Sequence, residues 1–465
     1  MNDLPISLLN SLENLQGFNK EAFQSVHQSG EQVTSIRFNN TKIPNYKFQI
    51  ADLETGIWDL EFSKIPWNSH GYYLSQRPSF TLDPLFHAGA YYVQEASSMF
   101  LEEVIKQTVD LSASIKVLDL CAAPGGKSTL IHSLISKDSL LVSNEVIKTR
   151  VNILSENMTK WGAANVIVTN NDPKDFQRLE SFFDIIVVDA PCSGSGLFRK
   201  DNDAITEWSE ENVNLCSQRQ QRILADILPA LKENGVLIYS TCSYSKAEDE
   251  DIANWLTKEQ KLISCKLSIN NEWGIVETQS AETNAYGYRF YPDKVKGEGF
   301  FIAAFKKQST ENHLRQIKNL KNQAKLSAKE IDTIKPYIQN VDDYIFIKQY
   351  EDILALPASL ENDLGIIQSS LYIKKAGVKL GSIIRNELIP DHELAMSTLL
   401  NNDLPAIEVD KETALNYLRR SDIKPDVDHK GWLLISYQQI PLGWVKALPN
   451  RINNYYPKEW RILNK

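Results

Sequence analysis

Short apolar runs alternate with longer amphipathic segments through the middle of the chain. Helical patterns start near Lys127, close on Gly162 and run from Glu211 to Lys232, just before Gly235. Strands are predicted between these helices, at residues 114–120, 140–145, 165–169, 184–190 and 235–243. Because short apolar strands separated by helices form parallel sheets covered on both faces, we predict a doubly wound, mostly parallel α/β sheet. Its ligand crevice should lie at the carboxyl ends of the strands.

The flanking segments have other patterns. Residues 1–85 include the aromatic and basic positions Arg37, Tyr46, Trp67 and Arg77 and are compatible with a small α+β domain. From about residue 390, the strand-like runs WLLISY and IPLGWVKAL, separated by Gln438-Gln439, indicate a β-rich module. We therefore expect four parts: an N-terminal domain (1–86), the sheet domain (87–308), a basic linker with a small domain (309–389) and the β-rich module (390–465).

The bulk composition limits the class of protein. At 465 residues the chain is too long for one compact core, and 42% hydrophobic with 23% charged residues is ordinary for soluble proteins. The first residues lack a secretory pattern, and no apolar run approaches the ~18 residues of a membrane span. Five cysteines without C-x-x-C spacing indicate neither a disulfide framework nor a structural zinc site. We expect a cytoplasmic protein that holds no metal.

A net charge of −9 argues against a protein that grips nucleic acid over its whole surface, although it does not exclude a local basic patch. One candidate patch lies between residues 306 and 335, where eight cations face three acids. For any single member, a solvated helix face is the better reading; the cluster as a whole stays a candidate RNA contact. Its cations are Lys306, Lys307, Arg315, Lys318, Lys321, Lys325, Lys329 and Lys335.

The loop after the first predicted strand, DLCAAPGGKST, has the small residues that let a backbone approach a ligand closely. Glu145, 19 residues after Gly126, suits ribose hydroxyls, and Asp172 suits an adenine amine. A phosphate loop requires Gly where Cys121 stands, and G-x-G-x-x-G is absent, so an adenosyl cofactor fits better than a nucleoside triphosphate or a nicotinamide. The predicted loop ligands are Cys121, Ala122, Ala123, Pro124, Gly125, Gly126 and Lys127.

The fourth and fifth predicted strands each end at a cysteine, Cys192 in DAPCSGSG and Cys242 in YSTCSYS. If the strands are neighbours, about 4.8 Å apart, both thiols and Asp189 face one pocket. A thiolate that adds to carbon 6 of cytosine makes carbon 5 nucleophilic, and a carboxylate can stabilise the charge that builds on the ring. We expect Lys127 to hold Asp189 and to lower the pKa of nearby thiols.

The cysteines also have structural interpretations that involve no catalysis. For Cys216 and Cys265 the simplest interpretation is a small packed side chain, and Cys121 is read as packing within the cofactor loop. A disulfide between Cys192 and Cys242 is a further alternative, which a reducing cytoplasm disfavours.

Seven pieces occur along the chain in this order: HAGAYYVQEASS, DLCAAPGGKST, Glu145, Asp172, DAPCSGSG, STCSYSKAEDE and RFYPDKVKGEGFFIAAF. Together they resemble the NOL1/NOP2/Sun family of RNA cytosine-5 methyltransferases. The resemblance spans about residues 87–305, and TSIRFN (34–39) is similar to the family's RNA-recognition segment. It implies S-adenosylmethionine as cofactor, bound by residues 121–127, Glu145, Asp172 and Asp189. It also implies Cys242 as nucleophile, with Cys192 assisting release. The family's E-N-E segment is here Glu248-Asp249-Glu250, which leaves that segment's role open.

The tail resembles that of bacterial small-subunit ribosomal RNA methyltransferases of the RsmF type, which implies a PUA-like RNA-binding module and ribosomal RNA or the small subunit as partner. We expect a monomer. For Trp432 and Trp444 a core position is preferred to RNA stacking. The alternatives are a transfer RNA substrate, a phosphate-loop NTPase with an RNA-binding tail and an inert RNA-binding assembly factor. The candidate RNA contacts of the tail are Trp432, Trp444, Lys446, Arg451, Asn454 and Tyr455.

Overall fold

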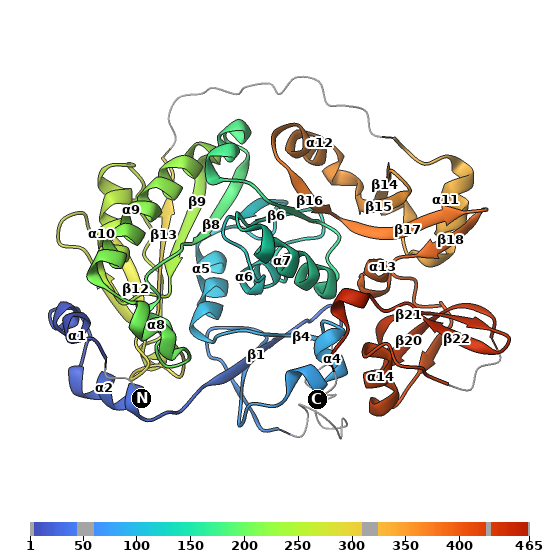
Figure 1. Cartoon of the computed structure of the whole chain (residues 1–465). Coiled ribbons are helices and arrows are strands. Elements are labelled where there is room, and N and C mark those ends of the chain that lie inside the picture. The colour runs from blue at the N-terminus through green and yellow to red at the C-terminus, as the bar shows by residue number, and fades with distance from the viewer. Residues whose placement is uncertain (1–3, 44–59, 309–323, 425–428, 464–465) are drawn as a thin grey trace.

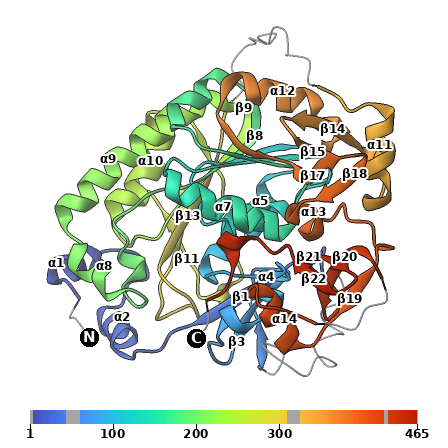
Figure 2. The same cartoon turned by 45° about the vertical axis from the view of Figure 1, so that its right-hand side comes forward.

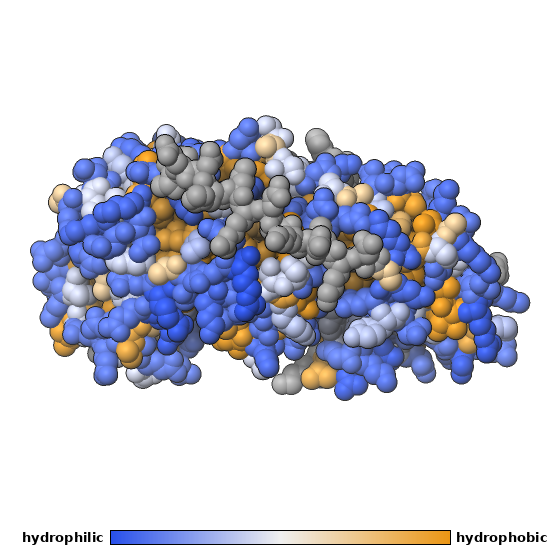
Figure 3. Space-filling view, turned by 90° about the horizontal axis from the view of Figure 1, so that it is seen from above, coloured by the Kyte–Doolittle hydropathy of each residue, from blue (hydrophilic) through white to orange (hydrophobic). Residues whose placement is uncertain are grey.

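The computed structural model describes residues 4–43, 60–308, 324–424 and 429–463. Tyr46 and the central part of the basic run, Arg315, Lys318 and Lys321, lie outside the described residues. Within these ranges no helix is both long and apolar enough to cross a membrane. Hydrophilic side chains cover most of the face seen in Figure 3.

Five parallel strands form the centre of a ten-stranded mixed sheet (Figure 1). The chain order reverses between the first and fourth of these strands, and at such a point the strand ends diverge and open a crevice. This confirms the predicted doubly wound sheet, with the two cysteine-bearing strands as neighbours. In spatial order the strands are β9 (Leu231–Thr241), β8 (Phe183–Asp189), β5 (Lys116–Asp119), β6 (Leu140–Asn144) and β7 (Val166–Thr169).

Helices cover both faces of the sheet (Figures 1 and 2). Successive residues of a strand point to opposite faces, so Val117 packs with one set of helices and Leu118 with the other. The first set is α5 (Leu101–Thr108), α6 (Gly126–His132) and α7 (Lys148–Trp161). The second set is α9 (Glu210–Ile227), α10 (Glu250–Lys258) and α12 (Glu361–Ser370), and a short helix α8 (Asn202–Glu207) precedes α9.

The helix predicted over residues 211–232 was wrong at its carboxyl end. Helix α9 ends at Ile227, and Leu231 already pairs with Phe183 as the first residue of β9. Pro229 stands between them and has no N–H for a helical hydrogen bond, so the chain leaves the helix before the predicted end.

Antiparallel strands extend the sheet at both edges. Strand β16 (Ile373–Ala376) pairs with β7, although it comes from the segment assigned above to a small C-terminal domain. At the other edge β13 pairs with β9, and the remaining strands follow outward from it. They are β13 (Phe300–Lys306), β12 (Tyr286–Phe290), β11 (Val276–Gln279) and the short β10 (Ile263–Ser264), which pairs with β13.

The N-terminal part, as far as it is described, contains three α-helices and an antiparallel sheet. Strand β4 of that sheet lies beyond residue 86, so the sheet includes a strand from the segment that was assigned to the next domain. Its first two helices pack on Trp208 and Tyr244 of the central sheet domain. The elements are α1 (Ile6–Leu12), α2 (Lys20–Gln28), α4 (Pro84–His87) and, in spatial order, β2 (Phe62–Lys64), β3 (Gly71–Leu74), β1 (Thr34–Phe38) and β4 (Tyr91–Val93).

Two further four-stranded sheets follow the central sheet in the chain. The first comprises β14 (Tyr344–Gln349), β15 (Asp352–Pro357), β17 (Val378–Ile384) and β18 (Glu387–Pro390), with α11 (Ala328–Ile334) before it and α13 (His392–Met396) after it. The second comprises β19 (Ala406–Glu408), β20 (Gly431–Tyr437), β21 (Ile440–Leu448) and β22 (Arg451–Asn454), with α14 (Lys411–Leu418). This last sheet confirms the predicted β-rich module, and its helix α14 contacts α4 of the N-terminal part (Figure 2).

Candidate active site

Acidic side chains stand at or just past the carboxyl ends of four adjacent parallel strands. Asp119 ends β5, Asp189 ends β8, and Glu145 directly follows β6. Asp172 lies past β7, where its carboxylate accepts a hydrogen bond from the backbone N–H of Lys174. Because neighbouring parallel strands end at one edge of the sheet, these carboxylates share the edge where ligands of such folds bind.

The predicted cofactor loop, residues 121–127, connects β5 to α6 at this same edge. Gly125 has a φ of +118°, a backbone conformation that glycine adopts without strain. In the first turn of α6, the hydroxyl of Ser128 donates to Asp119 Oδ2 at 2.7 Å and so ties the helix to the end of β5. The loop is therefore held against the acidic edge of the sheet.

Asp119 retains an unused acceptor. Its Oδ1 is buried and has no hydrogen-bond partner among the residues that the structure describes, and burial raises the pKa of this carboxyl to about 7. Glu145 Oε1 accepts from the N–H of Ile147 at 2.9 Å, while Oε2 lies 3.5 Å from Arg150. An ammonium group and ribose hydroxyls are the donors that such carboxylates accept. The residues present therefore fit an adenosyl amino acid.

The predicted contact between Lys127 and Asp189 is present. The ammonium nitrogen lies 2.8 Å from Asp189 Oδ2, and Ser240 Oγ donates to Oδ1 at 2.8 Å. Burial lowers the pKa of Lys127, but the Asp189 carboxylate outweighs it and raises the pKa above its ordinary value, so the ammonium stays charged. The Asp189 side chain is 34% exposed, which leaves it accessible to a substrate.

The thiols of Cys192 and Cys242 lie 2.9 Å apart, sulfur to sulfur, and both residues are half-buried. They face each other because β8 and β9 run in parallel, with Asp189 opposite Ser240. Both thiols are free. The sequence prediction that the two cysteines share one place with Asp189 therefore agrees with the geometry.

The other cysteines lie away from this pair. Cys216 is buried on α9, and Cys265 packs against the core just past β10. Cys121 packs against the core at the start of the cofactor loop, where burial raises the pKa of its thiol. All three agree with a packing interpretation.

Gly196 allows the two cysteine-bearing loops to touch. Its N–H donates to the carbonyl oxygen of Cys242 at 2.8 Å. A Cβ added to Gly196 would lie 2.7 Å from that oxygen and 2.5 Å from the carbonyl oxygen of Gly299. Any side chain here would push the loops apart, which explains why the second glycine of DAPCSGSG is needed at this position.

Glu248 joins the same two loops, and the sequence analysis did not assign it this position. Its carboxylate accepts hydrogen bonds from the N–H and hydroxyl of Ser193, at 2.8 and 2.5 Å, and from the hydroxyl of Ser243 at 2.6 Å. Gln220 of α9 donates to it at 3.2 Å. The available signal was the acidic run after STCSYS, but the sequence does not show which acid faces inward.

The next two acids of that run have a different partner. Asp249 and Glu250 both contact the buried guanidinium of Arg289 on β12, Asp249 at 3.1 Å. Thr241 also donates to Asp249 at 2.6 Å. These acids therefore fix the loop after β9 to the antiparallel edge of the sheet.

The position of Arg37 in the structure disagrees with the interpretation of TSIRFN as an RNA-contacting segment. All five residues of β1 are buried, so their side chains do not form an RNA-contacting surface. The guanidinium of Arg37 instead donates to Thr129 Oγ1 at 2.6 Å, to Gln94 Oε1 at 2.9 Å and to Ser133 Oγ at 3.1 Å, and it stacks on Trp161 at 4.7 Å. Burial lowers its pKa to about 9. Arg37 therefore anchors α6, the helix that follows the cofactor loop, to the N-terminal sheet.

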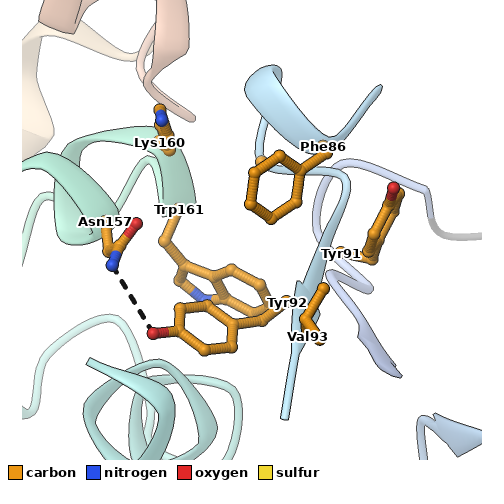
Figure 4. A pocket seen from close by; sticks show the side chains of 8 residues that line it. Phe86, Tyr91, Tyr92, Val93, Asn157, Lys160 and Trp161 are labelled. Atoms are coloured by element: carbon orange, nitrogen blue, oxygen red, sulfur yellow. Dashed lines mark hydrogen bonds between the residues drawn. The ribbon is translucent and has the colours of Figure 1, made fainter. Parts of the chain in front are cut away.

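A second link between the N-terminal sheet and the cofactor loop lies beside a pocket of about 120 Å³ (Figure 4). Asn157 of α7 donates to the carbonyl oxygen of Pro124 at 2.8 Å and contacts the hydroxyl of Tyr92 at 3.5 Å. Neither Cys192 nor Cys242 lines this pocket, whose walls include Phe86, Tyr91, Tyr92, Val93 and Trp161.

In the β-rich module the structure favours a core position for both tryptophans. Trp444 is buried and its indole N–H donates to the carbonyl oxygen of Asp391 at 2.9 Å. Trp432 is buried and packs against Tyr455 with ring centres 4.5 Å apart. The preferred interpretation of both tryptophans as core residues therefore agrees with the structure, and the alternative of RNA stacking does not.

Of the other predicted RNA contacts in this module, Arg451 and Tyr455 are exposed. Lys446 lies over the Trp432 ring at 5.0 Å, and Asn454 donates to the carbonyl oxygen of Tyr417 at 2.8 Å. Arg451 and Tyr455 thus remain the accessible candidates.

The described part of the basic run is partly committed to the fold. Lys307 donates to the carbonyl oxygens of Leu228 and Leu231, and Lys325 pairs with Glu361 at 2.7 Å. The three remaining described cations of the run, Lys306, Lys329 and Lys335, are exposed.

Three family models match successive parts of the chain: the N-terminal domain of 16S rRNA methyltransferase RsmF at 4–96, 16S rRNA methyltransferase RsmB/F at 107–306, and the methyltransferase RsmF PUA domain at 404–462. The ribosomal RNA small subunit methyltransferase F of Shewanella piezotolerans is 30% identical over 440 residues, which cover 91% of this chain and 90% of that protein. The chain belongs to the ribosomal RNA small subunit methyltransferase F family. The family member of Psychromonas ingrahamii is equally similar, at 30% identity and the same coverage.

Solved structures agree with this family's fold. A methyltransferase homolog protein from Pyrococcus horikoshii superposes with a TM-score of 0.52 at 27% identity, covering 65% of this chain and all of that one. NSun6 from Pyrococcus horikoshii has a TM-score of 0.54 at 20% identity, covering 66% and 99%, and shows the fold alone. The last sheet of the chain is the PUA domain of the methyltransferase F family.

Proposed function

We propose that this chain methylates carbon 5 of a cytosine in small-subunit ribosomal RNA, with S-adenosylmethionine as methyl donor and Cys242 as nucleophile. The observation that carries the proposal is the meeting of two free thiols, 2.9 Å apart, beside the accessible carboxylate of Asp189. A carbon nucleophile has to be generated from an electron-poor ring, and this combination of groups supplies both the attack and the charge stabilisation.

In the first step the Cys242 thiolate adds to carbon 6 of the cytosine. The new S–C6 bond breaks the C5=C6 double bond, whose electron pair moves to carbon 5 and makes that carbon nucleophilic. Asp189, whose orientation Lys127 and Ser240 hold, would accept hydrogen bonds from the 4-amino group and from N3 as that nitrogen takes up a proton from solvent during the attack. Stabilising the charge that develops on the ring is the main contribution of the carboxylate.

When bound, S-adenosylmethionine supplies the electrophilic methyl group that carbon 5 takes up. The residues that would hold this cofactor are those of the loop 121–127 together with Glu145, Asp172 and Asp189. The unpartnered Oδ1 of Asp119 adds an acceptor that suits the ammonium group of the methionine moiety. Their placement along one sheet edge supports this assignment.

Release requires that a base take the proton from carbon 5 and that the C6–S electron pair return to the Cys242 sulfur. The thiol of Cys192 lies beside that sulfur, so its S–H can donate to the departing thiolate and stabilise it. The contact between the two sulfur atoms suits either division of roles, and the assignment of Cys242 to attack and of Cys192 to product release rests on the family resemblance.

The RNA substrate follows from the family. The relatives named above are ribosomal RNA small subunit methyltransferases, and the PUA domain is an RNA-binding fold by resemblance. We therefore propose 16S ribosomal RNA, naked or assembled, as the substrate, with transfer RNA as the alternative.

Bisulfite sequencing of total RNA tests this proposal. In a strain that lacks the chain, one cytosine of 16S ribosomal RNA should lose its protection from deamination and should regain it with the wild-type chain but not with Cys242→Ala. Unchanged protection of every 16S cytosine, or loss confined to a transfer RNA, would refute the proposed substrate.

The cofactor has its own test in thermal melting. S-Adenosylhomocysteine at 100 times its Kd should stabilise the protein by about 2.7 kcal/mol, while ATP should not. Stabilisation by ATP alone would favour the NTPase interpretation instead.

A further inference from the structure

The spacing of the two thiols depends on Glu248. Every hydrogen bond that its carboxylate accepts comes from a residue next to one of the thiols or from Gln220. Ser193 follows Cys192 and Ser243 follows Cys242, and Gln220 also donates to the carbonyl oxygen of Pro191 at 3.1 Å. One carboxylate thus holds both cysteine-bearing loops at once.

The charge of Glu248 is also unusual in its setting. The side chain is fully buried, and in the described part of the chain no lysine or arginine pairs with it. The neighbouring acids Asp249 and Glu250 face Arg289 instead. Burial raises the pKa of the Glu248 carboxyl, and the hydrogen bonds from Ser193, Ser243 and Gln220 oppose that shift. In its carboxylate form Glu248 acts strongly on nearby titrating groups, because the interior screens its charge weakly.

The two thiols therefore have unequal surroundings. Negative charge on Glu248 acts on Cys192, whereas the ammonium of Lys127 lies within electrostatic range of Cys242. A carboxylate favours the protonated form of a neighbouring thiol, and an ammonium favours the thiolate. Both charges therefore favour a protonated Cys192 and an ionised Cys242.

We propose that Glu248 is a positioning residue that keeps the two thiols in contact and keeps their shared proton on Cys192, so that Cys242 is the thiolate. The kinetic consequences of this inference rest on the proposed function, but the thiol chemistry itself needs no RNA. The pair loses one proton to solvent, the other stays on Cys192 as an S–H···S⁻ hydrogen bond, and nothing is oxidised or reduced.

The groups that face Cys192 agree with this division. The hydrogen-bonded contact with Cys242, burial, and the charges of Cys242 and Glu248 all raise the pKa of the Cys192 thiol. Only the hydrogen bond with the backbone of Gly194 opposes them. Tyr239, on β9, faces the same region and is itself held neutral, because burial raises its pKa first and the nearby acids add to that shift. Cys192 therefore stays a thiol at neutral pH and can donate to the sulfur of Cys242.

Alkylation of the full chain measures this directly. Iodoacetamide is applied from pH 5 to 10, and the peptides with Cys192 and Cys242 are quantified by mass spectrometry. In the wild type, Cys242 should react at a lower pH than Cys192. In Glu248→Gln the Cys192 midpoint should fall by about one pH unit towards that of Cys242. A midpoint difference that Glu248→Gln leaves unchanged, with unchanged melting, would overturn the proposal.

Asp249→Asn is the matched control, because it replaces the adjacent buried carboxyl without touching either serine and introduces the residue common in the family. It should leave both midpoints in place. Ser193→Ala removes the hydroxyl hydrogen bond from Ser193 to Glu248 but keeps the Glu248 carboxylate. It should therefore preserve the order of the two alkylation midpoints. A reversed order in Ser193→Ala would show that loop geometry, and not the carboxylate, sets the difference, against the proposal.

Turnover separates this inference from the proposed function. With RNA, Glu248→Gln should lower kcat by about tenfold or more with little change in KM, while Asp249→Asn stays near the wild type. Failure of RNA methylation in the wild type would refute the proposed function and leave the thiol titration standing. Normal kcat in Glu248→Gln would refute the positioning role and leave the proposed function standing.

Discussion

The ammonium of Lys127 lies 2.8 Å from the carboxylate of Asp189, although 62 residues separate them in the chain. Lys127 lies in the first turn of helix α6 beside the cofactor loop, and Asp189 ends the neighbouring strand β8. The pair thus connects the cofactor side of the site to the thiol side. In the proposed reaction, the Asp189 carboxylate beside this ammonium acts as an acceptor towards the cytosine ring.

Asp189→Asn should lower the rate of methyl transfer by about 10²–10³-fold, since an amide cannot stabilise the protonated N3 and the 4-amino group of the ring as a carboxylate does. Single-turnover kinetics measures this loss, with saturating S-adenosylmethionine that is free of S-adenosylhomocysteine. In Asp189→Asn the ammonium of Lys127 loses its carboxylate partner. The double variant Lys127→Met/Asp189→Asn controls for this effect, because it removes the ammonium as well. If the double variant recovered wild-type rates, the loss in Asp189→Asn would come from Lys127, and the catalytic role of Asp189 would be wrong.

Arg37→Met should destabilise the protein by about 3 kcal/mol, because it leaves the acceptors Thr129 and Gln94 without their buried donor. The affinity for S-adenosylhomocysteine should fall as well, since α6 loses its anchor. Urea unfolding and calorimetric titration measure the two effects. The exposed Arg77→Met is the control and should change stability by less than about 0.5 kcal/mol. Equal effects of the two variants would contradict the bracing role.

Acid should destabilise the protein through buried histidines. Burial lowers the pKa of His132 to about 4 and of His392 to about 3. Unfolded histidines take up protons near pH 6.5 and the folded ones do not, so stability is lost as the pH falls from about 6.5 towards 4. Each histidine contributes up to about 1.4 kcal/mol per pH unit in that window.

His392→Phe isolates one of these contributions. Both ring nitrogens of His392 are buried without partners among the described residues, and the ring packs on Tyr456 and Trp460 at 5.2 and 5.1 Å. Urea unfolding between pH 6.5 and 4.5 should show a shallower loss of stability in this variant. The exposed His429→Gln should keep the wild-type slope. An unchanged slope in His392→Phe would show that the buried ring does not control the acid response.

The sequence predicts those parts of the fold and site that depend on local pattern. The apolar runs locate β5 to β9, and the short distance along the chain from each strand to its loop puts Asp189 beside Cys192. Non-local packing is not visible in the same way. β16 joins the sheet beside β7 from about 200 residues away, and no periodicity of residues 373–376 indicates it.

Burial of charge also escapes the sequence. Arg37 looks like a basic RNA contact because arginine is mostly exposed, whereas the structure encloses it between β1 and α6. Glu248 stands in a run of three acids, and its inward position follows only from the packing of α9 and the two serines against it. In both cases a polar side chain organises the site from inside, where composition gives no signal.

Cys242→Ala should reduce methyl transfer by at least about 10³-fold and leave the affinity for S-adenosylhomocysteine intact, because the thiol attacks the base and does not hold the cofactor. Transfer of labelled methyl groups to 16S ribosomal RNA and calorimetry measure the two properties. Cys216→Ala, on the outer helix α9, is the control and should keep wild-type activity. Appreciable turnover in Cys242→Ala would disprove its role as nucleophile.

The covalent intermediate is the central claim, and one measurement tests it most directly. Cys192→Ala, mixed with S-adenosylmethionine and substrate RNA, is run on a denaturing gel beside the double variant Cys192→Ala/Cys242→Ala. The account predicts a retarded protein–RNA band in the single variant, with RNA attached to the Cys242 peptide, and no band in the double variant. No band in the single variant, or a band that survives loss of Cys242, would contradict the account.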